Sequence, residues 1–193
     1  LVDLDEKMTT MFTQNPILTG FNKKSFSNPK VTIFNQDAFM WVKSSKEIFD
    51  VIIIDFPDPS NYSLGKLYSQ KFYQYLKRVS HNETVVVVQT TSPYFAPKSF
   101  WCINKTVESA LANTDAFHVY VPSFGVWGFT IASMNDNITF EKSNRQIKDL
   151  RFYQHDFSKL NYFPQDMKVK DVEINRLDNQ ILVRYFDEEW GKL

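Results

Sequence analysis

The sequence has little cysteine, little glycine and no long apolar run. Cys102 is the only cysteine, which excludes an internal disulfide or a cysteine zinc cluster, and its setting in "FWCINKTVESAL" predicts a buried thiol on a helix. No stretch reaches the roughly 18 to 20 apolar residues that a membrane-crossing helix needs. None of the five glycines forms a Gly-rich phosphate or nucleoside loop. These absences predict a soluble chain in the cytoplasm.

The charges of the chain balance, with 22 Lys and Arg against 22 Asp and Glu. There is no net field to draw the chain onto nucleic acid or an anionic membrane, so nucleic-acid binding is not expected. At 193 residues with 43% hydrophobic content, the chain can bury one substantial core. We also expect no metal cofactor.

The apolar pattern alternates between strands and helices and predicts a doubly wound α/β fold that ends in an antiparallel hairpin. We expect the end of a first strand at 1–5 and further strands at 31–34, 50–56, 84–90, 117–123 and 127–134. Helices are expected at 37–45, 63–80 and 99–114. The run of Val51 to Ile54 is typical of a central strand covered on both faces. In the less regular tail, only 174–190 is strand-like.

The chain opens on "LVDLDEKM", the end of a strand, with no strand and helix before it. The first strand of such a sheet normally lies in the centre, so we expect a fragment or the ordered part of a longer protein. We expect residues 1–135 to form a Rossmann-like domain that lacks its N-terminal part. Residues 136–193 are expected to be an extension packed on that domain, and the fragment alone should be inactive.

Two carboxylates follow the central strand directly, Asp55 at its end and Asp58 in the turn made by Pro57 and Pro59. Ligands bind at the carboxyl ends of strands in open α/β sheets, so this pair predicts a functional cleft. Alternatively, either Asp caps the helix that begins near Ser63. Asn61 or Ser63 can supply that cap as well.

Five segments together resemble the polyamine aminopropyltransferases, the spermidine synthase family. These are "VDLDEKM", "NPKVTIFNQDAFMWV", "FDVIIIDFPDPSNYSLGKLYSQKFY", "VVVVQTTSPYFAPKSFWCI" and "HVYVPSFGVWGF", and the likeness extends into the tail. It is closest to the branch whose catalytic domain follows a multi-pass membrane region. The resemblance implies a Rossmann-like, S-adenosylmethionine-dependent methyltransferase-type sheet and a cytoplasmic domain tethered to the bacterial inner membrane through a segment absent here.

The family implies transfer of an aminopropyl group from decarboxylated S-adenosylmethionine, the co-substrate, to a diamine such as putrescine. By resemblance, Asp55 is the base that deprotonates the acceptor amine, and Asp58 binds its ammonium group. Gln89, at the end of the next strand, adds a polar contact to the amine. Phe124 stands where many members have a tyrosine that walls the amine pocket, which leaves the identity of the acceptor open.

The donor nucleoside has its own expected contacts. By resemblance, Asp3 accepts both ribose hydroxyls at the end of its strand, and Asp37 with Ala38 meets the adenine amino group. An Asp before "AFMWV" is equally a helix N-cap. Tyr62 replaces part of a Gly-Pro segment of the family and is expected to stack on the nucleoside.

Two other functions stay open. A methyltransferase of the same fold would share Asp3 and Asp37 but would not need two carboxylates for a cationic acceptor. A noncatalytic interaction domain would use its aromatic surface, Trp101, Trp127 and Trp190, for assembly. The expected partners are a small diamine and a nucleoside donor, and a homodimer is left open.

Overall fold

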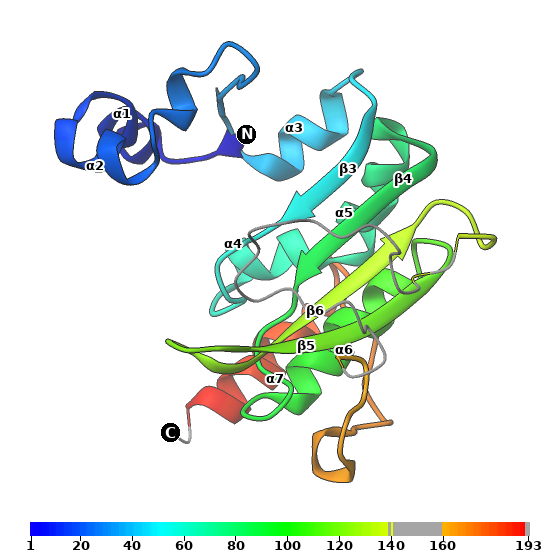
Figure 1. The fold of residues 1–193 in the computed structure, drawn as a ribbon. Helices are drawn as coiled ribbons and strands as arrows, with labels where there is room; N and C mark the ends of the chain where they lie inside the picture. The colour runs from blue at the N-terminus through cyan, green and yellow to red at the C-terminus, as the bar shows by residue number, and fades with distance from the viewer. Residues whose placement is uncertain (139, 141–159, 192–193) are drawn as a thin grey trace. The chain divides into compact units, whose positions relative to one another are not determined.

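The computed structural model describes residues 1–138, 140 and 160–191, which divide into two compact units, Leu1–Lys46 and Glu47–Leu193 (Figure 1). The predicted division at residues 135 and 136 is a different one and stays a prediction. Among the described residues, no helix combines the length and the apolar character that crossing a membrane requires.

The first unit contains a two-stranded parallel sheet and three short α-helices. Strand β1 (Val2–Asp3) pairs with β2 (Phe34–Asn35), and between them lie α1 (Glu6–Gln14), α2 (Pro16–Phe21) and the 3₁₀ turn η1 (Ser25–Ser27), with α3 (Ala38–Ser44) following. Asp5 and Asn15 accept backbone N–H groups at the starts of α1 and α2, as N-caps do. The strand expected at 31–34 is observed as β2, which is shorter and begins at Phe34.

The second unit is built on a four-stranded sheet in the order β3 (Phe49–Ile54), β4 (Ser80–Gln89), β6 (Gly125–Ser133) and β5 (Thr114–Val121). β3 and β4 run parallel, whereas β6 is antiparallel to both β4 and β5. The predicted terminal hairpin is therefore confirmed. β6, its second strand, inserts beside β4, and β5 forms the edge of the sheet.

One face of this sheet is covered by helices and the opposite face is open in the described residues. Figure 1 shows α5 (Gln70–Leu76) and α6 (Pro97–Glu108) behind the strands, and Val86 and Val88 of β4 are completely buried on that side. On the open face, Val51 is 59% and Ile53 is 76% exposed. The expectation of a central strand covered on both faces is therefore not met in the described residues: one face of β3 is exposed, and β3 lies at one edge of the four-stranded sheet.

The single helix expected over 63–80 is broken into four pieces. These are α4 (Tyr62–Gly65), the 3₁₀ turns η2 (Lys66–Tyr68) and η3 (Lys77–Val79), and α5 between the two turns. The break falls at Ser69, which is extended (φ −81°, ψ 152°) and accepts the Phe72 N–H at 3.3 Å as the N-cap of α5. The apolar spacing survives this break, because Tyr68, Phe72, Leu76 and Val79 are all buried.

In residues 160–191, the part of the tail that the structure describes, there is an α-helix and no strand. After the 3₁₀ turn η5 (Gln165–Met167), helix α7 (Ile181–Trp190) packs against α6 and α4. The strand expected over 174–190 is wrong because Ile181 and Leu182, which are buried, and Tyr185 and Phe186, which are half-buried, recur at helical spacing. The helix on which Cys102 was placed is confirmed as α6, and its thiol is fully buried.

Asn175 joins helix α7 of the tail to α4 and α6. Its side chain donates to the Gly65 carbonyl at 2.9 Å and accepts the Leu182 N–H at 3.3 Å, while its own N–H donates to the Thr106 hydroxyl at 2.9 Å. The residue is completely buried. Loss of the side chain would leave the Gly65 carbonyl and the Leu182 N–H without these partners in a dry environment.

We expect Asn175→Ala to lower the free energy of unfolding of the 193-residue chain by about 2 to 3 kcal/mol, the cost of leaving buried polar groups unsatisfied. Urea titration followed by circular dichroism measures it. Asn82→Ala, the same change at an exposed site, should stay within about 0.5 kcal/mol of wild type. Equal effects of the two substitutions would show that Asn175 does not hold the tail.

Candidate functional site

The site is built on the turn that follows β3. Asp55 comes directly after the last strand residue and is exposed, whereas Asp58, three residues later, is half-buried. Pro57 and Pro59 fix the backbone dihedral φ on either side of Asp58, and the Ser60 N–H donates to the Asp58 carbonyl at 2.7 Å. The two carboxylates are thus carried on a short, conformationally restricted loop.

Side chains from two other elements hold this turn. The hydroxyl of Tyr68, in η2, lies 3.0 Å from the Phe56 carbonyl oxygen and 3.1 Å from that of Pro57. The Gln89 Nε2, at the end of β4, donates to the same Phe56 carbonyl at 3.0 Å. The Phe56 ring packs edge-on against Phe72, with ring centroids 5.3 Å apart. The backbone between the two carboxylates is therefore fixed from both sides.

The carboxylate of Asp58 lies in an unusual environment. Its Oδ1 atom is buried and has no hydrogen-bond partner among the described residues. Burial raises the pKa of Asp58 above its ordinary value, and the nearby polar side chains of Gln89 and Thr91 lower it only in part. Asp58 as a residue is half-buried, and its buried Oδ1 has the chemistry to accept a hydrogen bond from a cationic ligand.

A hollow of about 280 Å³ brings together three of the predicted site residues, Asp55, Gln89 and Phe124. The remaining lining is apolar and comes from β3, β4 and the hairpin of β5 and β6: Ile53, Ile54, Val87, Val121, Trp127 and Phe129. The rings of Phe124 and Trp127 lie 5.2 Å apart, and Phe124 is 60% exposed. The hollow can therefore accommodate an alkyl chain with a polar group at the Asp55 end.

Gln89 has part of its amide engaged within the protein. Besides donating to Phe56, it accepts the Thr91 N–H through Oε1. The Gln89 side chain also lowers the pKa of Asp58 by hydrogen bonding, so its amide is engaged at this carboxylate as well. The predicted contact of Gln89 with an amine stays a prediction, and the structure adds a role in holding the turn.

Tyr62 begins α4 and is largely exposed, and Asn61 caps this helix by accepting the Leu64 N–H at 3.0 Å. Neither Asp55 nor Asp58 therefore supplies that cap. The exposed Tyr62 ring leaves the predicted stacking on a nucleoside as a prediction.

The residues predicted to contact the donor nucleoside belong to the first unit. Asp3 lies at the end of β1 and accepts the Asp5 N–H through Oδ1 at 2.8 Å. Asp37 caps α3 through its Oδ1, at 2.8 Å from the Phe39 N and 3.3 Å from the Met40 N. The capping alternative for Asp37 is thus confirmed, and its contact with adenine, like those of Asp3 and Ala38, stays a prediction.

Sequence reasoning missed Tyr68 and the place of Trp127 in the site. The alternation in β6 could have indicated Trp127, because Trp127 and Phe129 share a face two residues apart. Tyr68 belongs to the Leu-Tyr pair downstream of the turn in the segment that resembles the family, but it also fitted one more apolar position on a long helix, so its hydroxyl was given no role.

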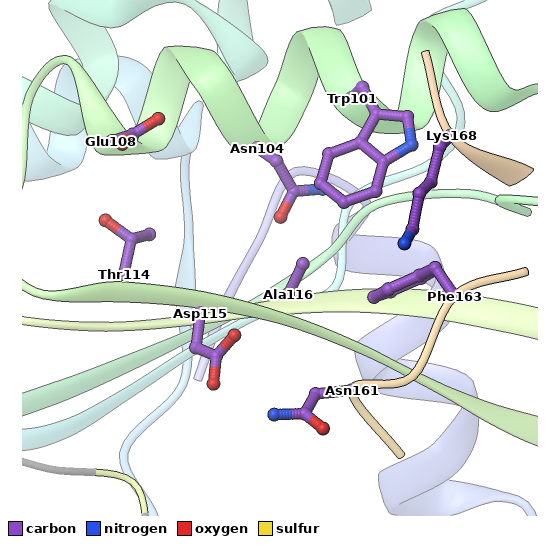
Figure 2. A pocket seen from close by; sticks show the side chains of 9 residues that line it. All are labelled: Trp101, Asn104, Glu108, Thr114, Asp115, Ala116, Asn161, Phe163 and Lys168. Atoms are coloured by element: carbon purple, nitrogen blue, oxygen red, sulfur yellow. The ribbon is translucent and has the colours of Figure 1, made fainter. Parts of the chain in front are cut away.

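A second hollow, of about 390 Å³, lies between α6, β5 and the segment after residue 160 (Figure 2). Its buried polar groups already have partners within the protein. Asn104 donates to the Phe100 carbonyl at 2.8 Å and accepts from the Thr130 hydroxyl at 2.5 Å, and the Trp101 indole N–H donates to Met167. None of the predicted site residues lines it. In the described part of the chain, no group of three or more His, Cys, Asp or Glu residues is placed to hold a metal ion.

The fold and the carboxylate turn define a class of protein, the Rossmann-like α/β domain with a binding site at the carboxyl ends of its parallel strands. Solved spermidine synthases have this fold. One from Thermotoga maritima matches with a TM-score of 0.61 at 20% identity, over 100% of this chain and 60% of that one. Another, in complex with the transition state analogue AdoDATO, matches with a TM-score of 0.59 at 21% identity, over 100% and 61%.

Sequence comparison defines the family. A family model for the spermine/spermidine synthase domain matches residues 1–143, and the chain belongs to that family. A polyamine aminopropyltransferase of Leptospira interrogans is 50% identical over all of this chain and 38% of its own length. Polyamine aminopropyltransferase 2 of Ralstonia nicotianae is 46% identical over 98% of this chain and 37% of its own length. The chain thus spans less than two fifths of these relatives.

The raised pKa of Asp58 predicts how its stability contribution varies with pH. Its pKa in the folded state lies above the unfolded value of about 3.8, so the folded state binds more protons just above pH 3.8 and loses stability as the pH rises through that window. Asp58→Asn removes this loss. We therefore expect the stability of the variant relative to wild type to increase from pH 4 towards neutrality, as measured by urea titration at several pH values. A difference that is constant with pH would contradict the buried carboxylate.

Proposed function

We propose that the protein containing this chain is a polyamine aminopropyltransferase. It transfers the aminopropyl group of decarboxylated S-adenosylmethionine to a diamine such as putrescine, which gives spermidine and methylthioadenosine. The amine nitrogen forms a bond to the carbon beside the sulfonium, the carbon–sulfur bond breaks, and the sulfur keeps its electron pair as a thioether. One proton must leave the nitrogen.

The observation that carries this proposal is the buried Oδ1 of Asp58, which has no hydrogen-bond donor among the described residues. Asp58 follows Asp55 by three residues. A charge-assisted hydrogen bond from an ammonium group would satisfy this oxygen. The family membership of the chain independently favours an amine substrate. We therefore assign binding of the cationic acceptor to Asp58.

Asp55 takes the proton in this proposal. An alkylamine that titrates like lysine, near pKa 10.4, is protonated at neutral pH, and exposing its lone pair costs about 4 to 5 kcal/mol. An exposed carboxylate at the lip of the hollow lowers that cost by accepting the proton as the nitrogen attacks. Asp58 does not line the hollow, but it shares one restricted turn with Asp55, and we assign both roles to the same amine.

The apolar hollow beside Asp55 is the proposed place of the acceptor's methylene chain. Phe124, Trp127 and Val87 offer no hydrogen-bonding group to a second charge, apart from the indole N–H. Each buried methylene contributes about 0.8 kcal/mol, so diamines one carbon apart should differ by roughly tenfold or less in kcat/KM. The pocket would thus select its substrate by length and by one anchored charge.

The donor nucleoside is assigned to Asp3, Asp37, Ala38 and Tyr62. Asp3 uses only Oδ1 for the Asp5 N–H, so its second oxygen can accept ribose hydroxyls. Asp37 caps α3 through Oδ1. We also propose that the catalytic domain lies in the cytoplasm and that the whole protein is tethered to the bacterial inner membrane. Whether it forms a homodimer is left open. Membrane fractionation and light scattering test the last two.

We expect Asp55→Asn to abolish aminopropyl transfer in the whole protein while methylthioadenosine still binds with its wild-type affinity, since the amide keeps the shape but cannot take the proton. Assays with putrescine and each of the two donors, decarboxylated and intact S-adenosylmethionine, measure the reaction. Asp50→Asn, the same change on an exposed carboxylate near the other end of β3, is the control and should remain active.

Activity of Asp55→Asn within tenfold of wild type would remove Asp55 as the base. Methyl transfer from the intact donor, without aminopropyl transfer, would instead make the protein a methyltransferase of the same fold. A protein that binds neither nucleoside by calorimetry would be a noncatalytic domain.

Asp58→Ala should raise the diamine KM by at least tenfold and leave the affinity for the sulfonium donor almost unchanged, because the lost contact is to the acceptor alone. Steady-state kinetics with putrescine and cadaverine at fixed donor concentration measures both effects. A variant that loses donor affinity while its diamine KM stays constant would assign Asp58 to the wrong substrate.

A further inference from the structure

The hydroxyl of Tyr68 is aimed at the backbone between the two carboxylates. Tyr68 is 0% exposed, and its oxygen lies 3.0 Å from the carbonyl of Phe56 and 3.1 Å from that of Pro57. A phenol carries a single proton, so one donor is shared by two consecutive carbonyls. These carbonyls belong to the only residues that separate Asp55 from Asp58.

We propose that Tyr68 is a positioning residue for the reaction, holding Asp55 and Asp58 in the geometry that one amine nitrogen requires. The inference rests on the proposed function and adds a residue to its machinery. Tyr68 is proposed to contact neither substrate and to act through the backbone of the turn. Its ring packs edge-on against Phe56, with centroids 6.1 Å apart, so both ends of its side chain contact the same turn.

The chemistry of Tyr68 suits this role at any pH at which the enzyme could work. Burial raises the pKa of its phenol far above the ordinary value, and the negative charges of Asp58 and Asp55 raise it further. The phenol therefore remains a neutral donor.

Gln89 donates to the Phe56 carbonyl as well, but it cannot replace Tyr68. Of the two carbonyls, its Nε2 reaches only that of Phe56, at 3.0 Å, and the Pro57 carbonyl is left to Tyr68. Pro57 itself has no backbone N–H with which to fix the turn. Loss of the Tyr68 hydroxyl would thus leave the Pro57 carbonyl, next to Asp58, without this donor and the Phe56 carbonyl with Gln89 alone.

Tyr73 provides a matched control. It is also 0% exposed and its ring packs on Phe72, with centroids 5.8 Å apart. Its hydroxyl, however, has no hydrogen-bond partner among the described residues. Tyr68→Phe and Tyr73→Phe therefore delete the same atom at equal burial, and only the first deletion breaks contacts to the turn.

The test uses the whole protein with putrescine and decarboxylated S-adenosylmethionine. Tyr68→Phe should lower kcat/KM for the diamine about tenfold, while methylthioadenosine affinity stays within about twofold of wild type. The acidic limb of the pH profile of kcat/KM should move to lower pH, because a loosened turn solvates Asp58. Tyr73→Phe should match wild type in all three measurements.

Each other outcome has a definite meaning. Tyr68→Phe with wild-type kinetics, in an enzyme that transfers the aminopropyl group, overturns the positioning role. Equal losses in both variants with an unshifted pH profile also overturn it, since they indicate a general loss of folded protein. A wild-type protein without aminopropyl transfer overturns the proposed function instead. In that case the effect of Tyr68→Phe on the pH dependence of unfolding still tests whether Tyr68 controls the environment of Asp58.

Discussion

The carbonyl oxygen of Phe56 is the point on which the proposed site depends. It accepts hydrogen bonds from Tyr68 in η2 and from Gln89 at the end of β4, and so joins the turn after β3 to two other elements. A partly buried carbonyl without partners costs stability, so the same contacts stabilise the fold and place the two carboxylates. A strand end alone would leave Asp55 and Asp58 on a free loop.

The site also carries an electrostatic cost that the rest of the fold must offset. Burial of Asp58 disfavours its charged form and raises its pKa, and its Oδ1 has no hydrogen-bond partner among the described residues. Its neighbours Gln89 and Thr91 compensate for this only partly. Such an arrangement has no benefit for folding, and it is reasonable where a cationic ligand supplies the missing interaction.

The covered and open faces of the four-stranded sheet have different roles. Behind the strands, Val86 and Phe100 belong to a closed core. On the other face, apolar residues such as Ile53 remain exposed and contribute to the hollow beside Asp55. The same strict alternation that builds the core therefore also provides an apolar wall next to two carboxylates, because successive side chains of a strand point to opposite faces.

The sequence by itself determined the order of strands and helices up to the hairpin, the buried Cys102 helix, and the turn with Asp55 and Asp58, since these follow from local periodicity and from proline. Only the tertiary structure decided the rest. The break at Ser69, the helix Ile181–Trp190 in place of a strand, and the contacts of Tyr68 depend on partners far away in the chain. A run such as "ILVRYF" has both strand propensity and helical spacing, and the surface on which it packs decides between them.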